Sequence, residues 1–159
     1  MRALLVGIFL VWAVTAQAQE KVYPGPFPLK GPIFGPEGQR VGTAHSYPRF
    51  VEIHHPTEGK IGRIGVLVEA GWARVHIVRD QKKLHMVGHA HKGKIYNMKK
   101  EMVGSYFWTP TYSYVYDLDG KRVGHTKCIA WPRVCAVGVA GYLLGLLNPP
   151  KGETDEANP

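Results

Sequence analysis

The sequence predicts a mostly β protein, made of about five repeated β-hairpins and a short C-terminal apolar segment that forms a helix. Two observations predict it. A unit of strand-forming residues, a turn and then a Val-Gly or Ile-Gly step recurs five times between residues 33 and 127. The stretch "VCAVGVAGYLLGLL" (134–147) is apolar throughout. One hairpin is marginally stable in water, so we expect the hairpins to bury their apolar faces together, as a ring or a meander.

The first 18 residues have the features of a signal peptide. Arg2 precedes the uncharged apolar run "ALLVGIFLVWAV", and Ala16-Gln17-Ala18 supplies the small-x-small pattern of a cleavage site. The run is shorter than the roughly 20 residues that a membrane-spanning helix needs. We therefore expect an exported protein, periplasmic or extracellular, with no transmembrane span after cleavage. An uncleaved anchor is the alternative.

Residues 19–32 are expected to be a lead-in rich in proline and glycine. Its segment "KVYPGPFPLKGP" contains four prolines and two glycines. Proline has no amide hydrogen, so this composition excludes a helix and is poorly suited to a central strand. We expect an extended segment that lies on the domain.

The hairpin repeat domain is expected to span residues 33–127. Its clearest unit is "YVYDLDGKRVGH" (114–125), where Asp117 to Gly120 form the turn and Gly120 is free to take a positive φ. The glycine of each Val-Gly step has no side chain, so it favours a bend or the approach of a neighbouring backbone. The glycines assigned to turns and bends are Gly38, Gly42, Gly62, Gly88, Gly104, Gly120 and Gly124.

Two units depart from this pattern, and another lacks only the turn glycine. By alignment, "VEIHHPTEGKIG" carries one extra turn residue, and "VHIVRDQKKLHMVG" carries about two and lacks a turn glycine. In "YNMKKEMVG", Lys100 stands where Gly120 stands in the fifth unit. We expect that the turn at Lys100 does not require a positive φ.

The hairpin pattern resembles the β-flower proteins, which are built from four or five "IYD-x-x-G-x-x-VG" hairpins arranged as petals around an axis. The resemblance covers about residues 33–127, and "KIYNMKKEMVGSYF" and "YVYDLDGKRVGHTK" carry it best. It implies a fold and little about activity. A MORN-type repeat would need Tyr-x-Gly-x-Trp at the strand, and Tyr116-Asp117-Leu118 does not supply it.

Residues 128–147 are expected to form a disulfide loop and an apolar segment packed on the domain. Cys128 and Cys135 are an even pair in an exported chain, which favours a disulfide. Closing this loop would stabilise the fold by roughly 2.5 kcal/mol in the chain-entropy model. Gly138, Gly141 and Gly145 fall near one face of a helix, but they also weaken it, so a further strand pair is the alternative. Residues 148–159 are expected to be a disordered tail.

Composition and motifs leave three hypotheses for function. The chain is basic, with a formal net charge of +8, and an exported basic protein meets anionic envelope components before nucleic acid. No nucleophile elbow or phosphate-binding loop is present, so we expect neither an enzyme nor a cofactor. The first hypothesis is a structural or binding module of the bacterial periplasm or cell envelope, whose partner is an anionic component or another envelope protein.

The second hypothesis is a metal-binding protein. His89 and His91 would share one face of a strand, and His125 and His45 hold equivalent places in other units, so histidines could converge on the axis. The third is a peripheral membrane protein that uses its apolar C-terminal segment and basic surface. The sequence alone favours the first, since it requires only export, the repeats and the disulfide.

Overall fold

The computed structural model describes residues 26–66, 73–80, 83–128 and 130–147. The predicted signal peptide, the start of the lead-in and the predicted tail lie outside these residues. The described elements are strands β1 (Leu29–Phe34), β2 (Arg40–Ser46), β3 (Phe50–His55), β4 (Gly59–Val66), β5 (Ala73–Asp80), β6 (Lys83–His91), β7 (Lys94–Asn97), β8 (Met102–Trp108), β9 (Tyr112–Tyr116) and β10 (Arg122–Lys127), and helix α1 (Pro132–Leu143).

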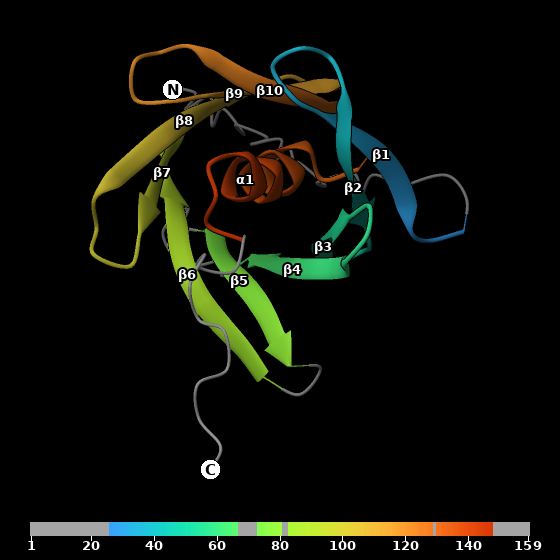
Figure 1. The fold of residues 1–159 in the computed structure, drawn as a ribbon. Coiled ribbons are helices and arrows are strands. Elements are labelled where there is room, and N and C mark those ends of the chain that lie inside the picture. The colour runs from blue at the N-terminus through green and yellow to red at the C-terminus, as the bar shows by residue number, and fades with distance from the viewer. Residues whose placement is uncertain (1–25, 67–72, 81–82, 129, 148–159) are drawn as a thin grey trace, which may run out of the picture.

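The strands form one closed antiparallel barrel with the helix inside it. Each strand pairs with its neighbours in chain order, and β1 pairs with β10 to close the ring. Figure 1 looks along the ring axis and shows α1 at its centre, with the hairpins arranged around it. The predicted mostly β fold, with five hairpins and a C-terminal helix, is confirmed. The helix lies within the ring of hairpins and not on its outside.

The Val-Gly step is a β-bulge, and it occurs at the same place in every hairpin. In the first hairpin Ile33 pairs with Gly42 and Phe34 with Arg40, so the register skips Val41. Such a bulge adds one residue to one strand and increases its local twist. The residues skipped in the five hairpins are Val41, Ile61, Val87, Val103 and Val123.

The bulge glycines allow two close approaches at once. A Cβ on Gly104 would lie 2.5 Å from the carbonyl oxygen of Tyr116 in the next hairpin and 2.7 Å from a methyl group of Leu144. Three other bulge glycines face the next hairpin's carbonyl and the C-terminal end of α1 in the same way: Gly42 with Tyr142, Gly124 with Leu143 and Gly88 with Leu146. The expectation that these glycines admit a neighbouring backbone is therefore confirmed.

The register corrects the alignment of two units. Ile53 pairs with Gly62, nine positions on, as Ile33 pairs with Gly42, so the second hairpin carries no extra residue. In the third hairpin Val75 pairs with Gly88, 13 positions on, so it is longer than the alignment indicated. A second register shift, between Val78 and Asp80, accommodates part of this length.

The turns of the first, fourth and fifth hairpins share one backbone geometry, which corrects the expectation for Lys100. Gly38 and Gly120 have φ of 81° and 75°, and Lys100 has φ of 64°. The lysine therefore takes the left-handed conformation that residues with a Cβ disfavour. The Oδ1 atom of Asn97 accepts hydrogen bonds from the amides of Lys99 (2.9 Å) and Glu101 (3.0 Å), and these bonds hold the turn in that form.

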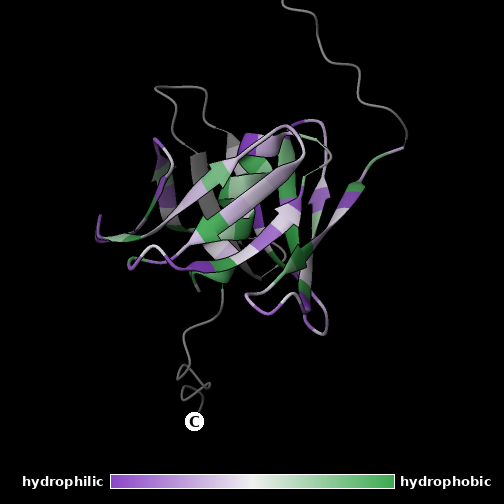
Figure 2. Cartoon of the chain, turned by 90° about the horizontal axis from the view of Figure 1, so that it is seen from above, coloured by the Kyte–Doolittle hydropathy of each residue, from purple (hydrophilic) through white to green (hydrophobic). Residues whose placement is uncertain are grey.

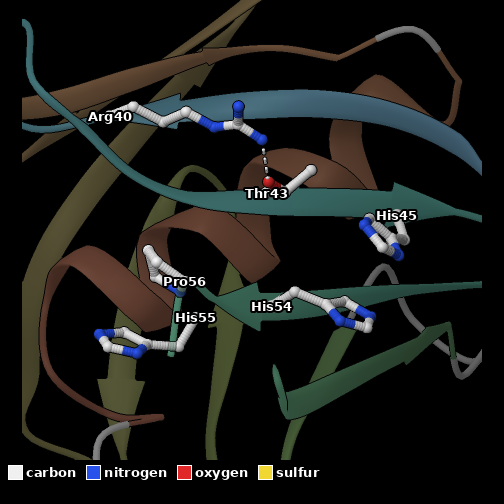
Figure 3. A pocket seen from close by; sticks show the side chains of 6 residues that line it. All are labelled: Arg40, Thr43, His45, His54, His55 and Pro56. Carbon is white, nitrogen blue, oxygen red and sulfur yellow. Dashed lines mark hydrogen bonds between the residues drawn. The ribbon is translucent and has the colours of Figure 1, made fainter. Parts of the chain in front are cut away.

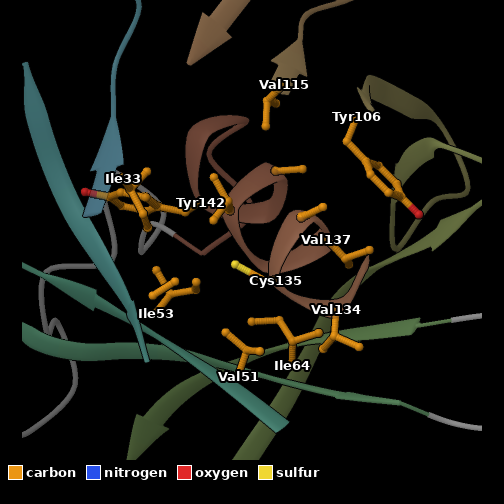
Figure 4. Packing of buried hydrophobic residues seen from close by; sticks show 14 of the residues in the cluster. Ile33, Val51, Ile53, Ile64, Tyr106, Val115, Val134, Cys135, Val137 and Tyr142 are labelled. Atoms are coloured by element: carbon orange, nitrogen blue, oxygen red, sulfur yellow. The ribbon is translucent and has the colours of Figure 1, made fainter. Parts of the chain in front are cut away.

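The core lies between the ring and the helix. One aliphatic residue points inward from the first strand of each of four hairpins, and these residues, Ile33, Ile53, Ile95 and Val115, are fully buried. On α1 every residue from Val134 to Tyr142 is buried. Figure 4 shows Ile33, Ile53 and Val115 around the helix, and in Figure 2 the hydrophobic residues gather at the centre while hydrophilic ones lie toward the loops. Most of the apolar segment therefore packs against the ring, while Leu143, Leu144 and Leu146 at its end are only partly buried.

A disulfide and a proline-bearing strand complete the closure. Cys128, after β10, is bonded to Cys135 in the first turn of α1, with Cα atoms 6.0 Å apart, as predicted. The expected lead-in was wrong over Leu29–Pro32, because these residues belong to β1. Pro32 has no amide hydrogen, and β1 tolerates it because β1 pairs with β10 only at Ile33 and Phe34. The carbonyl oxygen of Pro32 accepts a hydrogen bond from the Thr126 hydroxyl at 2.7 Å.

Candidate functional site

Aromatic and histidine side chains line the outer face of the ring where one hairpin meets the next. The residue after each bulge glycine points outward and faces the first strand of the next hairpin. His125 stacks on Phe34 with ring centroids 5.1 Å apart, and His89 stacks on Tyr96 at 5.2 Å. Thr43 and His54 are paired at the same position of another such junction. These positions are equivalent because each hairpin has its bulge at the same place, so the residue after the bulge glycine meets the same position of the next hairpin.

The predicted convergence of histidines on the axis is wrong. His45 lies on β2, His89 and His91 on β6, and His125 on β10, at different junctions of the ring. Each alternates along its strand with buried residues, so each belongs to the outer face, while α1 fills the interior. Among the described residues, no group of three or more His, Cys, Asp or Glu side chains is placed to hold a metal ion.

The structure instead forms an open pocket of about 460 Å³ on the outer face of the first two hairpins. Strand β2 supplies three of its side chains and β3 two, and Pro56 from the following turn completes it. The lining residues are Arg40, Thr43, His45, His54, His55 and Pro56. Figure 3 shows the imidazoles of His45 and His54 side by side, with Arg40 reaching along β2 toward Thr43.

Local structure orients each polar group of the pocket. The Arg40 guanidinium donates a hydrogen bond to the Thr43 hydroxyl at 2.7 Å. The rings of His45 and His54 stack with centroids 3.8 Å apart. The Nδ1 atom of His55 accepts from the amide of Thr57 at 3.3 Å. This acceptor role places the proton of a neutral His55 ring on Nε2, where it remains available as a donor.

Two carboxylates balance part of the positive charge beside the pocket, and Oε1 of one of them, Glu58, lies 3.9 Å from Nδ1 of His55. Glu52 lies 3.3 Å from Nε2 of His54 and 3.4 Å from Nζ of Lys60. Burial lowers the pKa of His45, and the neighbouring His54 and Lys30 lower it further, against a smaller opposing effect of Glu52. The His45 ring therefore takes up a proton less readily than a free imidazole.

The pocket has the donors to bind an anionic group. A guanidinium, a hydroxyl and three imidazoles surround it, and hydrogen bonds from charged donors to carboxylate or phosphate oxygens are the strong ones. A bound anion would also favour the protonated form of His45, since an opposite charge nearby stabilises the charged ring.

Sequence reasoning did not single out Arg40, Thr43, His54 or His55. A signal for His54 was present, because it lies seven residues before Ile61, as Phe34 lies seven before Val41. His54 therefore occupies the outward aromatic position of its hairpin. The pairing of His54 with Thr43 was not readable, since it depends on how separate hairpins align.

No helix among the described residues is long and apolar enough to cross a membrane. Comparison of the chain with protein-family models, with curated proteins and with solved structures found no match.

Proposed function

We propose that the protein is an exported, non-enzymatic binding module of the bacterial periplasm or cell envelope, and that its pocket holds an anionic group of an envelope component. The observation that carries the proposal is the set of donors from Arg40, Thr43, His45, His54 and His55 around one open pocket. The signal peptide pattern and the disulfide between Cys128 and Cys135 support export, because disulfides persist in oxidising compartments.

Two further observations support a binding role over an enzymatic one. Helix α1 occupies the interior of the ring, where a barrel would otherwise enclose a ligand cavity. Among the described carboxylates, Asp117 has a structural role in its turn, since its Oδ1 atom accepts hydrogen bonds from the amides of Asp119 (3.0 Å) and Lys121 (2.9 Å). The arrangement of five hairpins around an axis also agrees with the petal arrangement that the β-flower resemblance implies, and membership of that family stays a proposal.

The pocket can be tested by NMR titration with inorganic phosphate and with glucuronate, at pH 5.5 and pH 7.5. We expect saturable shifts of the His45 and His54 resonances with both probes. Glucuronate carries the same charge at both pH values, and it should bind more tightly at pH 5.5 because protonation of His45 favours the bound anion. Arg40→Gln should weaken binding about tenfold, which is the loss expected for one charge-assisted hydrogen bond.

Arg122→Gln is the matched control. Arg122 pairs with Tyr116 as Arg40 pairs with Phe34, so both arginines begin the second strand of a hairpin, but Arg122 is not a pocket residue. This variant should bind both probes like the parent. Equal weakening by the two substitutions, or no shift of the pocket histidines with either probe, would contradict the proposal.

A further inference from the structure

The two ends of the ring differ in charge. In an antiparallel ring the turns within hairpins lie at one end and the connections between hairpins at the other. We call the described residues 26–30, 46–50, 91–94, 108–112 and 127–133, other than 129, the connection rim. The turn rim comprises residues 35–40, 55–60, 97–101 and 117–122. Helix α1 begins at the connection rim, directly after β10 and the disulfide loop.

Cations gather on the connection rim without acidic side chains among its described residues. Its exposed cations are Lys30, Arg49, Lys92, Lys94, Lys127 and Arg133. The acidic residues whose side chains the structure describes lie elsewhere. Glu52 is on the wall of the ring, and the turn rim carries Glu37, Glu58, Glu101, Asp117 and Asp119. The turn rim mixes these acids with lysines and arginines, so positive potential is concentrated at the opposite end. The N-terminus of α1 adds partial positive charge there.

Exposed aromatic side chains occupy the same end. Trp108 and Tyr112 are each 41% exposed, and Phe27 and Trp131 are each 37% exposed. Phe107, at the end of β8 beside this rim, is 59% exposed. The exposed large apolar residues of the turn rim are Met98 and Leu118, and neither is aromatic. Exposed aromatic and cationic side chains therefore lie together on the connection rim.

We propose that the connection rim docks on an anionic lipid surface. Tryptophan and tyrosine favour the interface between lipid head groups and water, and lysine and arginine beside them are attracted to anionic head groups. The rim residues come from successive connections around a ring, so they face a common plane and not a single groove. This arrangement suits a flat surface better than the groove that an extended acidic polymer would need. The surface is separate from the pocket and does not depend on the proposed pocket ligand.

The test measures co-sedimentation of the mature protein with vesicles. Vesicles of phosphatidylglycerol and phosphatidylethanolamine should bind the protein, with a blue shift of tryptophan fluorescence, and phosphatidylcholine vesicles should bind it at least tenfold more weakly. Binding should weaken as salt rises, because mobile ions screen the attraction. Lys94→Glu with Lys127→Glu should reduce binding to the anionic vesicles at least tenfold, and Trp108→Ala should reduce both the binding and the blue shift.

The matched control is Lys99→Glu with Lys121→Glu, which makes the same charge change on the turn rim. All four lysines are exposed, and Lys94 and Lys99 lie near opposite ends of the short strand β7. The control should bind anionic vesicles within about twofold of the parent, because salt limits the reach of exposed charges to short distances. Equal losses in the two double variants would overturn the proposal, as would binding to soluble alginate without binding to vesicles. Melting curves of each variant separate loss of binding from loss of folding.

Discussion

Gly104→Ala tests the contact between the bulge, the next hairpin and the central helix. The added Cβ would stand 2.5 Å from the Tyr116 carbonyl oxygen and 2.7 Å from a Leu144 methyl group. The leucine can change rotamer, but the carbonyl belongs to a paired strand and moves only with the backbone. Overpacking of this kind costs about 1–3 kcal/mol, so we expect a loss of about 2 kcal/mol and a fall in Tm of about 4–8 °C.

Gly65→Ala is the matched control for this substitution. Gly65 lies in β4, where an added Cβ would meet no atom within 4 Å, and this variant should melt within about 2 °C of the parent. Adding Leu144→Ala to Gly104→Ala should cost less than the sum of the two single losses, because the shortened side chain relieves one of the two contacts. Thermal melts followed by circular dichroism measure all of these proteins. Equal melting of the Gly104→Ala variant and the parent would refute the reasoning, as would additive losses in the double variant.

Two further predictions concern the turns and the dependence of stability on pH. Lys100→Gly should raise Tm, because glycine removes the strain of a left-handed lysine, which costs about 1 kcal/mol of stability. Gly120→Val should lower Tm through backbone strain alone, since its Cβ would meet no atom within 4 Å. Unchanged melts for both variants would contradict the shared turn geometry. The pKa of His45 is lowered in the folded protein, so its contribution to stability is fully present above the unfolded pKa of about 6.5 and is lost as pH falls through the folded pKa. His45→Gln should therefore reduce the fall in stability between pH 7 and pH 5 in urea titrations, and an unchanged slope would show that this histidine does not carry the effect.

Short-range signals determined the repeating element of this protein. The Asp117 side chain and Gly120 form their turn from neighbouring atoms, so "DLDG" was sufficient to predict it. The disulfide was predictable because Cys128 and Cys135 were the only candidates. The same reasoning failed at Lys100, because a lysine in the sequence does not indicate a positive φ. Hydrogen bonds to the side chain of Asn97 hold Lys100 in its strained conformation.

The tertiary structure alone decided which face each outer residue takes and what lies beside it. A shift of one residue in strand register reverses the side chains, and every hairpin contains such a shift at its bulge. The stacking of His45 on His54 and the pairing of Thr43 with His54 both require two hairpins to align. Periodicity therefore determined the hairpins. The pairing of β2 with β3 determined the pocket, and closure of β1 on β10 placed the connections at one end of the ring, because both depend on how separate hairpins align around the helix.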